Sequence, residues 1–429
     1  MTAGLAVAAF VAAYVLIATE RIHRVAAALS GAAAMVVLGV VNSHVAFFSE
    51  ETGVDWNVIF LLLGMMIIVG VLRQTGVFEY LAIVTAKRAR GRPFAIMAGL
   101  MVLTGVASAL LDNVTTVLLV APVTLLVCDQ IHKRPAPFLI AEVMAANIGG
   151  TATLVGDPPN IIIASRSGLT FNDFLVHLAP IAIVLLAVTV LLCGLLFRAD
   201  LRHDPEVADG LNDLDAGEAI TDRRLLLRCG VVLLLVIVGF VGQPVFHLEP
   251  SIVALLGAGA LVTVSGQEPA SYLAEVEWPT LVFFMGLFVM VGGLVKVGAI
   301  SGLAHVVTEA TDGRYLLATS AVLVGSGVLS GVVDNIPYVA TMAPLVHDLV
   351  GSGPGGATGQ AAWWALALGA DLGGNATAVG ASANVVVIGI AARNGHPISF
   401  WTFTRYGVVV AAVTIALSWG YVYLRYFVG

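Results

Sequence analysis

Two short stretches of this sequence combine carboxylates, carboxamides and glycines within apolar segments. The first, residues 147–160, reads NIGGTATLVGDPPN, and the second, residues 371–384, reads DLGGNATAVGASAN. Seven of the fourteen aligned positions are identical. Both stretches contain too many helix-breaking residues for a continuous membrane helix. Helices that break at matching places in two halves of a chain mark the binding sites of secondary transporters. The pattern therefore predicts a transporter whose solute binds at the two breaks.

A second pair of polar sites lies upstream of the breaks. Asp112-Asn113 falls in the middle of the apolar run 94–128, and Asp334-Asn335 holds the matching place in the second half. The run is too long for one membrane span and too short for two. We therefore expect a re-entrant hairpin in which two half-helices meet at a polar tip. Irregular backbone of this kind is tolerated in a membrane only where protein buries it.

These motifs supply four carboxylates, each with a carboxamide nearby. Ionisable groups at membrane depth are costly and usually line a pathway. Carboxylates and freed backbone carbonyls suit a hard cation, whereas freed helix N-termini suit an anion or a polar solute. The candidate solute- and ion-binding residues are Asp112, Asn113, Thr115, Asn147, Gly149, Gly150, Thr151, Asp157, Asn160, Asp334, Asn335, Asp371, Gly373, Gly374, Asn375 and Asn384. The candidate Na⁺ ligands among them are Asp112, Asn113, Asp334 and Asn335.

Each of these residue types also has a structural interpretation. Asp and Asn can cap the half-helices, and Thr can bond back to its own helix. The paired glycines allow either tight unwinding or close helix packing. Glu142, whose counterpart is the apolar Leu366, is either a proton site in one half or a hydrogen-bond partner of a neighbouring helix.

The sequence places no Lys or Arg in the broken-helix cores or at the hairpin tips. Acidic groups without basic partners favour a cation, a proton relay or a neutral polyhydroxyl solute over a multivalent anion. A carrier of such anions would have to rely on helix dipoles, amides and co-bound cations instead.

The composition places the motifs in a membrane protein. Of the 429 residues, 59% are hydrophobic and 11% are charged, whereas a soluble domain has about 25% charged residues. Uncharged runs of about 20 residues suit helical spans, so the lipid bilayer is an expected partner. The formal net charge of -7 argues against a nucleic-acid partner, which would need a basic surface. With no phosphate-binding loop in the sequence, transport must draw on a gradient or be passive.

The two halves correspond along most of their length. The hairpin motifs are 222 residues apart, and the breaks are 224 apart because the Gly-rich loop near 351–359 adds two residues. We expect an all-α integral membrane protein with a first repeat at 1–197, a cytoplasmic connector at 198–223 and a second repeat at 224–429. Each repeat should hold five transmembrane helices plus one re-entrant hairpin. Because five is odd, the second repeat must be inverted, with the broken helices meeting at the midplane.

The basic residues predict the orientation of this multi-pass protein. With the N-terminus outside, sixteen of the twenty Lys and Arg residues fall in inside loops. The positive-inside rule therefore predicts that the N- and C-termini both lie outside the cell (inner) membrane. The first apolar run, residues 3–18, lacks the basic start of a signal peptide, and we expect it to be the first span.

Four phrases carry a family resemblance: LLDNVTTVLLVAPVT, IAEVMAANIGGTATLVGDPPNIII, VVDNIPYVATMAPL and WWALALGADLGGNATAVGASANVVV. At these motifs the chain resembles the ion transporter superfamily of arsenite efflux pumps, sodium/proton antiporters, and citrate and dicarboxylate carriers. It is most similar to the arsenical-pump branch that includes the melanocyte P-protein. The resemblance implies scaffold and transport subdomains, a homodimer and an elevator-like motion. For an arsenical pump it also implies a soluble ATPase partner.

One departure from the superfamily bears on the substrate. In sodium–dicarboxylate relatives, Ser-Asn-Thr at each hairpin tip binds sodium and carboxylate. Here the tips read Asp112-Asn113-Val114 and Asp334-Asn335-Ile336. The difference weakens the expectation of dicarboxylate transport. Asn113 and Asn335 are the two tip residues that still match the binding residues of those relatives.

The leading expectation is a secondary active transporter that couples arsenite or antimonite efflux to protons. Arsenite is mostly an uncharged trihydroxide at neutral pH, so Asn, Asp and Thr side chains can bind it through hydrogen bonds. The alternatives are a sodium/proton antiporter, a sodium-coupled carboxylate carrier and an anion conductance. We expect no cofactor other than Na⁺ or H⁺ as coupling ion, and no enzymatic activity. The Gly-Leu-Gly-Asp motif of intramembrane aspartyl proteases is poorly matched by the sequence at residues 155–158.

Overall fold

The computed structural model describes residues 2–19, 21–49, 52–202, 215–266 and 268–428. Helices account for 79% of the structure, and the described ranges contain no strand, which confirms the all-α class. Within these ranges, eight helical segments are long and apolar enough to cross a membrane. They are α1 (Thr2–Thr19), α4 (Trp56–Arg73), α6 (Pro93–Leu110), α7 (Asn113–Gln130), α11 (Ala179–Leu196), α13 (Arg223–Val241), α17 (Trp278–Lys296) and α23 (Phe400–Tyr423) with η3 (Leu424–Val428).

The remaining helices complete the fold. Five are shorter apolar helices: α2 (Arg24–Val37), α8 (Ala136–Gly150), α15 (Pro250–Ser265), α19 (Tyr315–Ser330) and α22 (Ser382–Arg393). Three more pack against one another: α9 (Pro158–Ser167), α20 (Asn335–Gly351) and α21 (Gly356–Gly373). The connecting ones are α3 (Ser43–Phe48), α5 (Val77–Arg88), α10 (Phe171–His177), α12 (Ala216–Ala219), α14 (Gln243–Phe246), α16 (Pro269–Leu273) and α18 (Ala299–Ala310). The breaks between α8 and α9, and between α21 and α22, fall inside the two glycine-rich motifs.

The expected hairpins are longer than two half-helices. Arms α6 and α7 have 18 residues each and turn at residues 111–112, where Asp112 caps α7. In the second half α19 has 16 residues and α20 has 17, and Asp334 caps α20. At about 1.5 Å per residue the first pair of arms is about 27 Å long. The polar tip is where it was predicted, but the arms extend well beyond half of a bilayer core.

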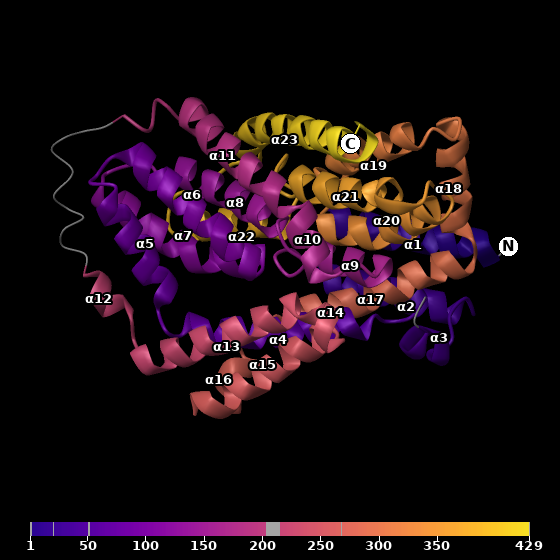
Figure 1. The fold of residues 1–429 in the computed structure, drawn as a ribbon, viewed down its shortest axis with the longest axis horizontal. Helices are drawn as coiled ribbons and strands as arrows, with labels where there is room; N and C mark the ends of the chain where they lie inside the picture. The colour runs from indigo at the N-terminus through magenta and orange to yellow at the C-terminus, as the bar shows by residue number, and fades with distance from the viewer. Residues whose placement is uncertain (1, 20, 50–51, 203–214, 267, 429) are drawn as a thin grey trace.

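The helices form two groups (Figure 1). In the view of Figure 1, α2, α4, α13, α15 and α17 form the lower group, and α6–α9, α11 and α19–α23 form the upper one. Between 22% and 28% of the residues of α1, α11 and α13 are buried, whereas α4 and α17 are 72% buried. Helices α1, α11 and α13 therefore present apolar surface to the outside of the protein, as helices in contact with lipid do.

The two halves of the chain interlock. Helix α4 packs against α15 of the second half, and α17 packs against α2 of the first. Both contacts are close because they involve glycine: a Cβ on Gly64 would lie 2.7 Å from the carbonyl carbon of Ala254, and one on Gly286 would lie 2.9 Å from that of Ala28. The pairs are reciprocal, since each half supplies one glycine helix and one alanine helix.

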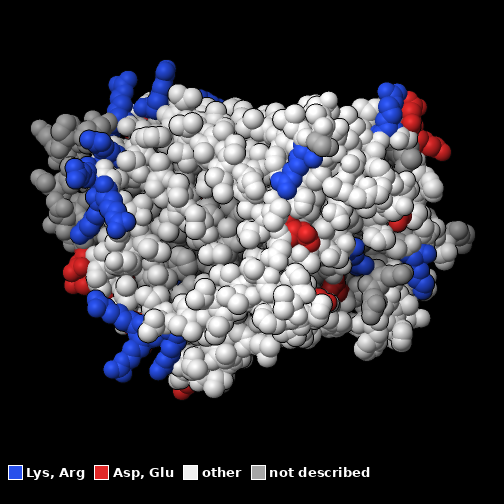
Figure 2. Space-filling view, in the orientation of Figure 1, with Lys and Arg blue, Asp and Glu red and all other residues white. Residues whose placement is uncertain are grey.

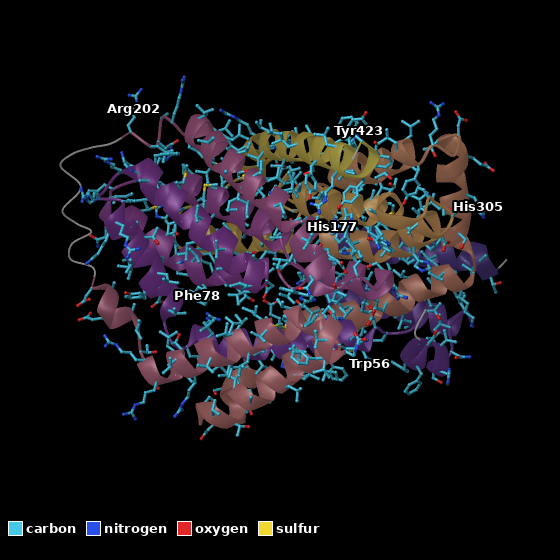
Figure 3. All side chains as sticks on the ribbon, in the orientation of Figure 1. Trp56, Phe78, His177, Arg202, His305 and Tyr423 are labelled. Atoms are coloured by element: carbon cyan, nitrogen blue, oxygen red, sulfur yellow. The ribbon has the colours of Figure 1, made fainter. Side chains whose placement is uncertain are left out.

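The charged side chains gather at the ends of the long axis. Figure 2 shows Lys and Arg concentrated at the end that holds α12 and the start of α13. Figure 3 places Arg202 toward this end and His305 at the opposite one. Of the expected connector, residues 203–214 lie outside the described ranges. Its last part is fixed to the protein, because Thr221 N donates to Thr75 O at 3.1 Å.

Candidate functional site

Each broken helix is tied to the hairpin of its own half. Thr153, in the first break, donates from Oγ1 to Ala109 O at the end of α6, at 2.5 Å. Thr377, in the second break, donates to Gly331 O just after α19, at 2.6 Å. These bonds hold the unwound segments beside the two hairpin tips.

Two asparagines satisfy backbone carbonyls that the breaks leave free. Asn160 Nδ2 donates to three carbonyl oxygens across the first break, the shortest bond being 3.0 Å to Thr153 O. Asn384 Nδ2 donates to Gly374 O and Thr377 O, both at 2.8 Å. Asn160 and Asn384 are fully buried, so these bonds replace the hydration that the carbonyls would otherwise require.

The amides of the two hairpin tips meet at a single carboxylate. Asn113 Nδ2 donates to Asp157 Oδ2 at 3.0 Å, and Asn335 Nδ2 donates to the same oxygen at 3.2 Å. Asp157 is 1% exposed and is the residue that precedes α9. Its other oxygen, Oδ1, has no hydrogen-bond partner in the described structure. The vacant oxygen is therefore a place where a proton, a cation or a hydroxyl donor could bind.

Asn147 joins the two halves. Its Oδ1 accepts from Asn113 Nδ2 at 3.0 Å, and its Nδ2 donates to Asn375 Oδ1 at 2.9 Å and to Asn384 Oδ1 at 3.2 Å. We call the linked residues the amide–carboxylate cluster: Asn113, Asn147, Asp157, Asn335, Asn375 and Asn384. All of them are at most 3% exposed. The cluster offers oxygen acceptors and amide donors from both tips and both breaks.

Other predicted site residues lie next to the cluster. Asp112 Oδ1 accepts from Thr115 N at 2.7 Å, and Asp334 Oδ1 accepts from Ile336 N at 3.0 Å. Thr151 Oγ1 bonds back to the carbonyl oxygen one helical turn earlier, at 2.9 Å. The tip carboxylates and Thr151 thus make the structural contacts that the sequence also allows. Asp371 is fully buried near the cluster, and neither of its carboxyl oxygens accepts a hydrogen bond.

The four predicted glycines divide into two kinds. A Cβ on Gly149 would lie 2.0 Å from an α6 carbonyl oxygen, and one on Gly373 would lie 2.5 Å from an α19 carbonyl oxygen, so these two are helix-packing residues. A Cβ on Gly150 would lie 2.7 Å from Gly156 O across the break, and one on Gly374 would meet Gly380 O at 3.2 Å. Only Gly150 and Gly374 allow the close backbone contact across the unwound segments.

Glu142 is 1% exposed on α8 and accepts a hydrogen bond from Thr124 Oγ1 of α7. This contact agrees with the second of its two sequence interpretations, a hydrogen bond to a neighbouring helix.

One basic residue from a distant part of the sequence reaches the second hairpin tip, whose own sequence contains no Lys or Arg. Arg24, the first residue of α2, donates from Nη1 to Ser382 Oγ at 2.7 Å, and Ser382 Oγ donates to Asp334 Oδ2. Arg24 Nη1 lies 3.9 Å from the same carboxylate oxygen. Its Nη2 donates to Thr280 Oγ1 of α17 at 3.3 Å. In the sequence, Arg24 is one of several basic residues in a short loop, so no local pattern indicates this bridge.

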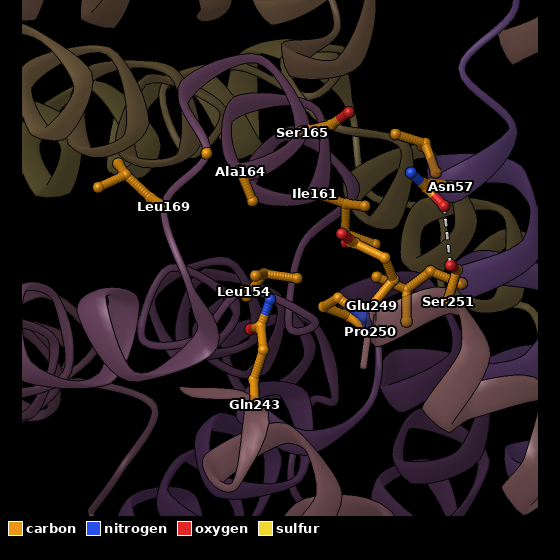
Figure 4. A pocket seen from close by; sticks show the side chains of 13 residues that line it. Asn57, Leu154, Ile161, Ala164, Ser165, Leu169, Gln243, Glu249, Pro250 and Ser251 are labelled. Atoms are coloured by element: carbon orange, nitrogen blue, oxygen red, sulfur yellow. Dashed lines mark hydrogen bonds between the residues drawn. The ribbon is translucent and has the colours of Figure 1, made fainter. Parts of the chain in front are cut away.

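A cavity of about 530 Å³ leads to the tips from the Arg24 side, and Arg24, Asp334 and Val385 are among its lining residues. A smaller cavity of about 240 Å³ lies between α4, α9 and α15 (Figure 4). Ile161 lines the smaller cavity and is the repeat counterpart of Val385, 224 residues earlier. Val385 is 40% exposed and Ile161 is 4% exposed. Of these two matched side chains, the one on the Arg24 side is therefore the more accessible.

Several known proteins that this chain resembles are described as transporters or membrane proteins. The family profile described as "Citrate transporter" matches residues 14–369. An uncharacterized transporter of Mycobacterium tuberculosis is 59% identical over 423 residues, covering 99% of this chain and 98% of that protein. A 46 kDa membrane protein of Mycobacterium leprae is 56% identical over 424 residues, covering 99% of each chain.

More distant proteins share the architecture. The P protein of Homo sapiens is 32% identical over 502 residues, which cover 99% of this chain and 60% of that protein. The crystal structure of the YdaH transporter of Alcanivorax borkumensis, whose topology is described as unusual, superimposes with a TM-score of 0.60 at 15% identity. That match covers 85% of this chain and 84% of the other. At this identity the structural similarity concerns the fold.

Proposed function

The chain belongs to the citrate transporter family of membrane transporters, and we propose that it is an ion-coupled secondary carrier whose solute and coupling ion bind at the amide–carboxylate cluster. The observation that carries this proposal is the meeting of both hairpin-tip amides on one buried carboxylate. Capping alone does not require Asn113 and Asn335 to share Asp157. Because the two tip amides share this acceptor, a solute or ion that binds to Asp157 would change the contacts of both hairpins at once.

The chemistry of the cluster favours a small hydrogen-bonding solute with a proton as coupling ion. Amides and carboxyl groups can donate to and accept from the hydroxyls of an uncharged trihydroxide. We therefore propose proton-coupled efflux of arsenite or antimonite as the first candidate, as in the arsenical-pump branch, where a soluble ATPase would be the partner. Sodium/proton antiport and anion conductance use the same groups with a different cargo.

A carboxylate carrier is the second candidate, because two observations favour it. The matching family is described as citrate transporters. In addition, Arg24 places a guanidinium in the wall of the larger cavity and bonds to Ser382 at the start of α22. An arginine and a helix N-terminus together suit a carboxylate. The tip sequences still lack the Ser-Asn-Thr pattern of the sodium–dicarboxylate carriers.

Proteoliposomes with a trapped pH dye separate these cargoes. Gradients of Na⁺, arsenite and citrate are imposed one at a time on the purified protein. We expect proton flux with arsenite and none with citrate or Na⁺ alone. Flux driven by Na⁺ alone would replace the efflux proposal with antiport, and flux only with citrate would establish the second candidate. A current without proton movement would support a conductance.

For the architecture, we propose two inverted repeats, at 1–197 and 224–429, joined by a cytoplasmic connector at 198–223. The reciprocal α4–α15 and α17–α2 contacts support a two-fold relation between the halves. The gathering of Lys and Arg at one end supports an inner-membrane orientation with both termini outside (Figure 2). We also propose a homodimer with an elevator-like motion of the transport part, and re-entrant hairpins formed by α6–α7 and α19–α20.

Labelling of single cysteines tests the orientation. In a cysteine-free background, Arg90→Cys, in the α5–α6 loop, should react with a membrane-impermeant maleimide only in inside-out vesicles. Gly313→Cys, in the α18–α19 loop, should react only in right-side-out vesicles. The reverse pattern would invert the proposed topology, and labelling of both from one side would exclude the inverted repeat.

A further inference from the structure

The two breaks differ at one pair of matched positions. Asn147 of the first break corresponds to Asp371 of the second, 224 residues later, and both are fully buried. Asn147 donates from Nδ2 across the cluster to Asn375 and Asn384 of the other half. Asp371 carries no such donor when it is ionised. An acid therefore stands where the first half has an amide that donates two hydrogen bonds.

The surroundings of Asp371 mirror those of Asn147. The repeat counterparts of Asn375 and Asn384 are Thr151 and Asn160, and the side chains of both lie within interaction range of Asp371. The same two positions therefore face the acid in one half and the amide in the other.

The donors beside Asp371 are already in use. Thr151 Oγ1 donates to Asn147 O at 2.9 Å, and Asn160 Nδ2 is shared by three carbonyl oxygens at 3.0 to 3.4 Å. Those carbonyls also fix the orientation of the Asn160 amide. The unpaired atoms that remain are all acceptors, namely both carboxyl oxygens of Asp371 and Asn160 Oδ1. Buried acceptors without a donor are costly. One proton on Asp371 would supply the missing donor.

We propose that Asp371 is the proton-binding residue of this carrier and that it is a neutral acid in this structure. Its O–H donates to Asn160 Oδ1, as Asn147 Nδ2 donates to Asn384 Oδ1. Asp157 lies within electrostatic range of Asp371, and two ionised carboxylates there would repel each other. The inference rests on the proposed function, because a bound proton serves coupling only in an ion-coupled carrier.

Release of the proton changes what the second hairpin can contact. In the first half Asn113 donates to both Asn147 and Asp157, whereas Asn335 donates to Asp157. Ionisation would make the free oxygen of Asp371 a stronger acceptor for the Asn335 amide, and a bond between them would complete the pattern of the first half. The proton passes to water, and no other covalent bond changes. Protonation of Asp371 is thereby coupled to the position of the second hairpin tip.

Infrared difference spectroscopy on the purified full-length protein tests the protonation state without any solute. A protonated carboxyl group has a C=O stretch well separated from that of a carboxylate. At neutral pH the wild type should show a protonated-acid band that Asp371→Asn weakens. Asp129→Asn, a matched change at an exposed position on α7, should leave the band unchanged. A band of full intensity in Asp371→Asn would overturn the proposal.

A repeat-exchange variant then tests the coupling. Asn147→Asp combined with Asp371→Asn moves the acid to the matched position in the first half. The arsenite, citrate and Na⁺ gradients serve as probes. Asp371→Asn should lower the proton flux at least tenfold relative to the wild type, and the double variant should regain part of that flux. Full flux in Asp371→Asn would refute Asp371 as the coupling residue and leave the carrier function intact. A wild type silent with all three probes would count against the proposed function, while the infrared result would still decide the protonation state.

Discussion

The junction of the two hairpin tips at Asp157 gives a prediction whose size follows from the hydrogen bonds. Asp157→Ala removes the acceptor of two buried amide groups. A buried donor left unpaired costs about 1–3 kcal/mol. Asn113 keeps its bond to Asn147, so its share of the loss is smaller. We expect Asp157→Ala to lower the free energy of unfolding by about 2–5 kcal/mol.

Asp157→Asn should behave differently, because it retains an oxygen where both tip amides converge. Bonds to a charged acceptor exceed neutral ones by about 1 kcal/mol each, so the loss should stay under about 2 kcal/mol, and near zero if Asp157 is protonated. Thermal unfolding in one detergent, followed by tryptophan fluorescence, ranks the variants. Asp129→Ala and Asp129→Asn, at an exposed site on the same hairpin, should both match the wild type. Equal melting temperatures for the two Asp157 variants would refute the idea of a shared acceptor.

Two further predictions concern packing and access. Gly149→Ala should destabilise the protein by more than about 1 kcal/mol because its Cβ would lie 2.0 Å from a backbone oxygen, whereas Gly259→Ala, with open space around it, should stabilise its helix by about 0.5–1 kcal/mol. The thermal unfolding assay distinguishes them, and similar shifts would contradict the packing assignment. Arg24→Gln should slow maleimide labelling of Val385→Cys about two- to fivefold, since a partly exposed ion pair contributes up to about 1 kcal/mol. Arg21→Gln removes a neighbouring charge and should not change the labelling rate; equal effects of the two changes would show that the Arg24 bridge does not control access to residue 385.

Much of the site could be predicted from the sequence because its signals are local. Glycines, prolines and an N-cap residue end a helix through their own backbone chemistry, so the breaks and the tips fell within the motifs that predicted them. The role of each tip residue was less accessible. Asp112 has backbone N–H groups beside it and uses its carboxylate as a cap, whereas the neighbouring amide of Asn113 reaches the cluster. These different roles of Asp112 and Asn113 depend on which side chain points toward the cluster. Residue type alone does not specify that direction.

Contacts between distant segments could not be predicted in the same way. Arg24 reaches Asp334 because α2 begins close to the second hairpin. No spacing in the sequence indicates that these two segments lie side by side. The choice of Asp157 as the shared acceptor depends on how two hairpins from opposite halves approach each other. The asymmetry of the two cavities is likewise a property of how the halves are packed.

The exchange of helices between the halves also constrains how the protein is made. Helix α4 enters the bilayer while its partner α15 is still untranslated, and at 5–20 residues per second the wait is roughly 10 to 35 s. During that interval the surface around Gly64, which the finished protein covers with Ala254, has only lipid or the insertion machinery against it. The first half is thus committed to the membrane before it can be completed. Biogenesis of this chain ends in the mutual docking of two inserted halves, so a ribosome that stalls between them leaves an unmatched face in the bilayer for quality control to recognise.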